Sequence, residues 1–88
     1  MKRIHIRVYG DVHGVFFRAF VKEKAQALGL VGFVRNSEES VEIVAEGDGP
    51  ALQRLLAACR HGPPKAKVLR VEVEEETVRQ EFSTFERR

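Results

Sequence analysis

The residues that could do chemistry in this chain gather around Arg18. Residues 10–18 run from the end of an alternating segment, through a loop that contains Gly14, into a stretch with helical spacing. The free N–H groups at the start of a helix carry about half a positive charge, so a loop that curls over them can bind an oxyanion. Gly14 gives the backbone freedom for that curl, and the planar guanidinium of Arg18 can hold two phosphate oxygens at once. The segment predicts an anion site; the alternative is a glycine-containing turn followed by a surface arginine.

Other kinds of chemistry find little support. His5, His13, His61 and Cys59 lack the ligand spacing of a zinc site, and two aspartates are too few for a two-metal phosphatase centre. No Gly-Lys-Ser/Thr ends the loop, so it is not a Walker nucleotide site. Cys59 falls on the apolar stripe of an expected helix, where a lone thiol usually acts as a small hydrophobe. We therefore expect no metal site.

Length and composition indicate one ordinary globular domain, residues 1–88. Fifteen Lys and Arg against thirteen Asp and Glu leave a net charge of +2, which does not demand a nucleic-acid partner. A single Cys cannot form an intramolecular disulfide, and no apolar run follows Met1. We expect a cytoplasmic protein without a signal peptide or membrane span. The many Arg and Glu residues and the single Asn, Asn36, suggest either a heat-adapted source or GC-rich coding.

Strand and helix patterns alternate along the chain. Period-two alternation predicts strands at 4–9 and 68–74, and two β-branched segments on either side of the polar turn 37–39 predict a hairpin of strands at 31–36 and 40–46. Apolar residues at helical spacing predict two helices, one at 17–28 and one that starts at Asp48-Gly49-Pro50 and stops at Gly62-Pro63-Pro64. A short fifth strand is expected at 82–85, before the charged residues 86–88. The acidic run Glu72, Glu74, Glu75 and Glu76 is interpreted as a solvated strand face.

This order of elements is that of the ferredoxin-like split βαβ arrangement, an α+β fold. It predicts an antiparallel sheet with both helices on one face. The apolar side chains expected to meet between sheet and helices are Ile4, Ile6, Val8, Leu69, Val71, Val73, Phe20, Leu28, Leu52 and Leu56. The fold class does not select a function, since the same scaffold carries enzymes, metal carriers, RNA binders and regulatory modules.

Two motifs at matching separation resemble the paired signature of acylphosphatases. The first is Val12-His13-Gly14-Val15-Phe16-Phe17-Arg18 and the second is Gly32-Phe33-Val34-Arg35-Asn36. The resemblance covers nearly the whole chain, since the element order, the length and the Gly62-Pro63-Pro64 segment are also similar to that family. It implies a hydrolase that splits a carboxyl-phosphate anhydride into a carboxylate and inorganic phosphate, without metal or organic cofactor.

The resemblance also implies roles for residues. Arg18 matches the phosphate-binding arginine of the family, the backbone amides of His13 to Arg18 complete the cradle, and Asn36 matches the asparagine that positions the attacking water. The family has His or Gln at the place of His13, and Gln cannot shuttle a proton, so we expect a loop-shaping or hydrogen-bonding role there. Ser40 stands where the family commonly has Gly, which leaves the geometry of the turn after Asn36 open.

Three rivals remain at this point. An RNA-binding module of the same architecture would stack bases on aromatic residues of strands 1 and 3, but the expected third strand has no aromatic residue and contains two acids. A regulatory domain could hold a small anion without turning it over, although Asn36 argues against it. The third rival is the acylphosphatase-like portion of a larger carbamoyl-phosphate-using protein. We expect a free-standing monomer that acts on a small-molecule acyl phosphate, with no nucleic-acid or membrane partner.

Overall fold

Five strands and two helices make up the chain in the computed structural model, which describes residues 1–88. In chain order they are β1 (Lys2–Asp11), α1 (Phe17–Ala27), β2 (Val31–Asn36), β3 (Ser40–Gly47), α2 (Gly49–His61), β4 (Lys67–Glu76) and β5 (Phe85–Arg87). All six major segments predicted from periodicity are present. Gly29 and Gly62, each with a positive φ near 71°, follow the two helices, as expected for glycines that end helices.

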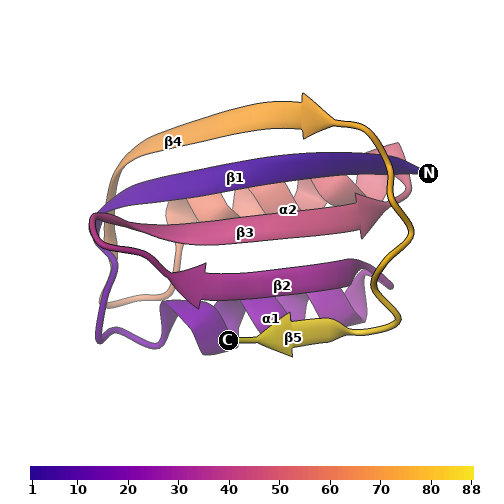
Figure 1. The fold of residues 1–88 in the computed structure, drawn as a ribbon. Helices are drawn as coiled ribbons and strands as arrows, with labels where there is room; N and C mark the ends of the chain where they lie inside the picture. Colours follow the sequence, from indigo (N-terminus) through magenta and orange to yellow (C-terminus); the bar gives the residue numbers. More distant parts are fainter.

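The strands form one sheet in the order β4-β1-β3-β2-β5, and both helices cover the same face of it (Figure 1). The pairs β1–β3, β1–β4 and β2–β3 are antiparallel. The predicted ferredoxin-like α+β fold is therefore confirmed. One detail differs, because β5 pairs parallel to β2 and makes the sheet mixed.

The fifth strand also lies later than the expected 82–85. Phe85 is buried in the core, whereas Phe82 packs edge-on against Phe33 with ring centroids 5.9 Å apart. The two phenylalanines pack in different environments. The strand therefore begins only at Phe85 and includes two residues of the charged end, Glu86 and Arg87. Its alternate residues, Phe85 and Arg87, therefore share one side of the sheet.

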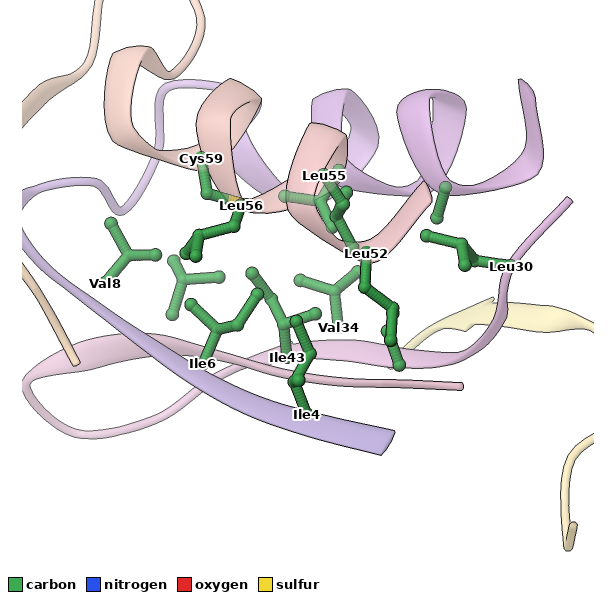
Figure 2. Close-up of a cluster of buried hydrophobic side chains, with 14 of the residues drawn as sticks. Ile4, Ile6, Val8, Leu30, Val34, Ile43, Leu52, Leu55, Leu56 and Cys59 are labelled. Atoms are coloured by element: carbon green, nitrogen blue, oxygen red, sulfur yellow. The ribbon is translucent and has the colours of Figure 1, made fainter. Parts of the chain in front are cut away.

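The hydrophobic core lies between the sheet and the two helices. Ile4, Ile6 and Val8 of β1 point toward Leu52 and Leu56 of α2 (Figure 2). Phe20 and Leu28 pack at the edge of this core. Cys59 is also buried there, and burial raises the pKa of its thiol to about 12, so that it behaves as a small apolar side chain.

The prediction for β4 was wrong in part. Val71 packs against the core, but Leu69 is 75% exposed and Val73 is 38% exposed. The register of β1 and β4 shifts between Tyr9 and Gly10, which leaves Leu69 as an extra residue in a bulge. Val73 keeps its place opposite Ile6, but β4 is an edge strand that the helices cover incompletely.

Charged side chains cover the face of the sheet that has no helices. Arg3 contacts carboxylate oxygens of Glu46 at 3.2 Å, Glu76 at 2.9 Å and Glu81 at 2.9 Å. His5 lies between Glu42 and Glu76, at 2.7 Å and 3.2 Å. Glu76 is thus a bound member of this network and not, as expected, part of a solvated run, whereas Glu72, Glu74 and Glu75 are exposed.

Glu46 connects this network to the segment that leads to β5. Its carboxylate is fully buried and accepts the backbone N–H groups of Arg79 at 2.9 Å and Gln80 at 3.2 Å. Burial alone raises the pKa of Glu46, but these two donors and the guanidinium of Arg3 outweigh it, and the pKa lies below its usual value. The ionised carboxylate therefore stabilises the folded state and holds the path of the chain toward β5.

We expect Glu46→Gln to lower the free energy of unfolding at pH 7 by about 1.5–3 kcal/mol, since charge-assisted hydrogen bonds to a buried group are lost. A depressed pKa gives stability that is present above the unfolded-state value and is lost as the pH falls through the folded-state value. Urea unfolding should therefore show the difference from the parent shrinking below about pH 4.5. The control Glu74→Gln, at an exposed pair with Arg7, should cost less than about 1 kcal/mol. An equal loss in both variants would contradict the role given to Glu46.

The two helices are too short and too polar to serve as membrane spans.

Candidate active site

The loop between β1 and α1 forms the floor of the candidate site. Val12 is 2% exposed and Val15 packs against the core, so two apolar side chains anchor the loop from below. Gly14, between the two valines, has φ 69°, and Phe16, directly after Val15, has φ 63°. Left-handed residues that alternate with ordinary ones turn successive N–H groups toward one side of the backbone, which makes an anion-binding concavity.

Phe16 is an unusual residue at its position. Its ring is 78% exposed and its backbone is left-handed, a conformation that costs a non-glycine residue about 1–3 kcal/mol. It also occupies the N-cap of α1 without a side-chain hydrogen bond to the helix. Neither apolar burial nor capping therefore explains the conformation, which is the kind of backbone strain that clusters at functional sites.

The N–H groups of this loop are free. The first helical hydrogen bond runs from the N–H of Phe20 to the carbonyl of Phe16 at 3.0 Å, and none of the N–H groups from His13 to Ala19 donates to a backbone carbonyl. The first turn of α1 contains no acidic residue that could neutralise them. The start of α1 therefore presents several unfilled donors and the positive end of the helix dipole together.

Arg18 lies in the first turn of α1, beside the end of β5. Its Nη1 donates a hydrogen bond to the carbonyl oxygen of Arg88 at 2.8 Å. The N–H of Arg88 in turn donates to the carbonyl of Val34 in β2, also at 2.8 Å. Because both contacts involve the same residue, the guanidinium of Arg18 is held close to the adjacent ends of β2 and β5. Figure 1 shows these ends and the β1–α1 loop at the same end of the sheet.

Asn36 reaches the same site from β2. Val34 is fully buried under the helices, and side chains of a strand alternate between its faces, so Asn36 points to the helix side. Arg35, between them, lies on the other face and pairs with Glu42. One pocket is lined by Asn36 together with loop and helix residues: Gly14, Phe16, Phe17, Arg18 and Ala19, with Arg87 from β5. The two predicted site residues, Arg18 and Asn36, are therefore brought together.

His13 connects the loop to the turn after Asn36. Its Nε2 lies 2.8 Å from the carbonyl oxygen of Ser40, which also accepts the N–H of Ser37 at 2.8 Å. His13 is not in the pocket lining, and its imidazole instead connects the loop to this turn. Ser40 takes its position without a positive φ, and its hydroxyl lies 2.6 Å from that of Ser37. The turn thus closes with serine in place of the glycine common in the resembled family.

The size and charge of the pocket fit a small anion. Its volume is about 210 Å³, below the range of about 300–1,000 Å³ that is usual for sites of drug-sized ligands. Its lining includes two basic residues, Arg18 and Arg87, and no acidic residue. No group of three or more His, Cys, Asp or Glu side chains in residues 1–88 is arranged to hold a metal ion. The donors that converge here are those that bind phosphate-like oxyanions.

Sequence reasoning missed Arg87. The segment 86–88 was treated as a charged end outside the sheet, whereas its residues Glu86 and Arg87 belong to β5. The available signal was the apolar Phe85 two residues before Arg87, because period-two alternation from a buried phenylalanine places Arg87 on the helix side.

The fold and the site define a small ferredoxin-like protein with a loop of free backbone N–H groups at the start of its first helix. The family model described as Acylphosphatase matches residues 4–87. A curated acylphosphatase of Methylococcus capsulatus is 50% identical over 86 residues, which cover 97% of this chain and 94% of the relative. The chain belongs to the acylphosphatase family.

Solved structures agree with this assignment. The acylphosphatase of Bacillus subtilis superposes with a TM-score of 0.93 at 38% identity and covers 98% of this chain and 97% of its own. Full-length HypF, in its phosphate- and nucleotide-bound form, contains a similar unit: the TM-score is 0.91 at 29% identity, over 98% of this chain but 11% of HypF. The fold and the overall activity expected from the resemblance, hydrolysis of acyl phosphates, are confirmed.

Proposed function

We propose that this acylphosphatase hydrolyses its substrate by attack of water on a phosphoryl group that is held by the backbone amides of His13 to Arg18 and by the guanidinium of Arg18. The observation that carries the proposal is the convergence of Arg18, Asn36 and the unfilled loop donors on one pocket. The overall reaction consumes one water, breaks the bond between phosphorus and the acyl oxygen, and yields a carboxylate and inorganic phosphate.

The phosphoryl group needs positive charge more than it needs covalent chemistry. Phosphoryl transfer passes through a loose transition state whose charge is spread over three equatorial oxygens. The loop amides and the helix start supply fixed dipoles toward those oxygens, and Arg18 adds a planar fork that can bind two of them. Since the donors are already oriented in the folded chain, little reorganisation is needed when charge develops.

Asn36 positions the water. Its side-chain amide offers one oxygen that accepts and one NH₂ that donates, so it can orient a water without carrying a charge. A carboxylate in this place would repel the phosphoryl oxygens. The leaving carboxylate has a conjugate acid with a pKa of about 4, so it departs without a general acid. These requirements explain why the pocket contains no titratable acid or base besides its arginines.

We infer in addition that the enzyme acts as a monomer in a reducing, cytoplasmic compartment. Arg18, Asn36 and the free loop donors converge within a single chain, so the proposed mechanism needs no second subunit. Cys59 is the single cysteine and is buried as a free thiol, as is usual for proteins of reducing compartments.

The main rival is a regulatory domain that binds an anion without turning it over. An RNA-binding role has less support, because the open faces of the central strands β1 and β3 are occupied by the ion pairs of Arg3, His5 and Arg7. The deciding experiment is hydrolysis of benzoyl phosphate by the purified protein in the presence of a chelator. Release of inorganic phosphate well above the spontaneous rate supports the proposal. Binding of phosphate without any hydrolysis would favour the regulatory domain.

A further inference from the structure

We propose that Arg87 is a specificity-determining residue, which reads a second negative charge on the acyl portion of the substrate. The inference rests on the proposed function. It names a substrate class: acyl phosphates whose acyl group carries its own carboxylate or phosphate, at a distance from the reacting phosphorus that an arginine side chain can span.

The position of Arg87 follows from the pairing of β5. Val34 is the register partner of Arg87 in the parallel β2–β5 pair, and Phe85, two residues earlier, is 2% exposed in the core. Alternation therefore places Arg87 on the helix side of the sheet, next to the first turn of α1. The next residue accepts the hydrogen bond of Arg18. Arg87 is thus held one residue away from a group that contacts the phosphate-binding arginine.

The guanidinium of Arg87 has no partner within the chain. It takes part in none of the ion pairs or side-chain hydrogen bonds, although its neighbour Arg88 pairs with Glu86 and stacks over the ring of Phe33. Arg87 is exposed and lines the pocket, whose lining contains no carboxylate. An unpaired cation beside a second cation raises the positive potential of the pocket. This potential favours binding of an additional negatively charged group next to Arg87.

The phosphoryl group already has enough donors without Arg87. It presents three non-bridging oxygens, and the pocket lining includes Gly14, Phe16 and Phe17, whose N–H groups are free, together with the N–H and the fork of Arg18. These donors come from the β1–α1 loop and α1, whereas Arg87 comes from β5 and is exposed to solvent. The acyl portion must leave the phosphoryl cradle toward solvent, so an exposed side chain of the pocket lining is placed to meet it.

The test compares benzoyl phosphate with 4-carboxybenzoyl phosphate, which differ by one carboxylate far from the reacting bond. We expect Arg87→Gln to lower the ratio of kcat/KM for the carboxylated substrate to kcat/KM for benzoyl phosphate by about tenfold. Arg87→Lys should keep most of the preference because it keeps the charge. Arg54→Gln is the matched control, since Arg54 is exposed on α2 away from this pocket.

The possible outcomes separate the inference from the proposed function. If Arg87→Gln lowers kcat/KM equally for both substrates, Arg87 acts on the phosphoryl group and the inference is wrong. If neither substrate is affected, or if Arg54→Gln lowers the preference as much, the inference is also wrong, while hydrolysis by the parent still supports the proposed function. If the parent hydrolyses neither compound, both proposals fall together.

Discussion

Replacing Arg18 with alanine should lower kcat/KM for benzoyl phosphate by about 10³- to 10⁵-fold, the range over which a single arginine acts in phosphoryl transfer. Arg18 is the cation that the fold places directly at the start of α1 among the free loop amides. Arg18→Lys keeps the charge and loses the planar fork, so it should recover only a small part of the activity. Steady-state kinetics over a range of substrate concentrations provides the measurement.

Two controls make this result specific. Arg54→Ala removes one exposed arginine from α2 and should leave kcat/KM within about twofold. Urea unfolding should show that Arg18→Ala changes the free energy of unfolding by less than about 1 kcal/mol, because its one recorded hydrogen bond is exposed. Free guanidinium at millimolar concentration should restore part of the activity of Arg18→Ala. Full activity without Arg18 would rule out its assignment to the phosphoryl group.

The second large effect is expected at Asn36. Asn36→Ala should lower kcat by about 10²- to 10³-fold, as for loss of one positioned polar group in other active sites. KM should change little, because the proposed contact is to water and not to the substrate. Asn36→Asp should lower kcat and also raise KM, because the added negative charge repels the phosphoryl group before the reaction begins.

Arg35→Gln is the natural control for this series. Arg35 precedes Asn36 in β2 but points to the opposite face, where it pairs with Glu42. Its loss should leave kcat within about twofold. If Arg35→Gln and Asn36→Ala impaired turnover equally, the effect would come from damage to β2 and not from a lost water contact. A rise in KM without a fall in kcat for Asn36→Ala would place Asn36 on the substrate.

Most of the fold could be predicted because local pattern and tertiary packing agree. The alternation in β1 matches the side that this strand buries, and glycines stand where both helices end. The errors arose where the local pattern was not the deciding factor. Leu69 alternates with Val71 and Val73 in sequence, but a bulge in β4 removes it from the buried side. A one-residue register shift of this kind depends on the partner strand, which local periodicity does not describe.

The residues of the candidate site also differ in whether the sequence could predict them. Arg18 was predicted from the glycine-containing loop at a helix start and Asn36 from the resemblance of the paired motifs to acylphosphatases, and the structure places both in one pocket. Arg87 belongs to no motif. In the sequence, an arginine in a charged segment cannot be distinguished as solvated or as part of a site. Only the parallel pairing of β5 with β2 distinguishes the two cases. The connection from β4 to β5 precedes that pairing, and Glu46 holds it by accepting the N–H groups of Arg79 and Gln80. Glu46 lies more than thirty residues earlier in the sequence, so a local pattern does not show this contact.

The left-handed backbone of Phe16 lowers the stability of the protein but keeps the loop amides oriented for catalysis. An exposed aromatic ring in a strained backbone, beside amides that have no partner, makes the empty enzyme less stable than its fold would allow. Substitutions that relax this loop would be retained by selection for stability alone, and each would weaken the prepared cradle. A lineage that keeps this strained loop is therefore under continued selection for turnover. A relative in which the loop has relaxed is expected to have lost the activity.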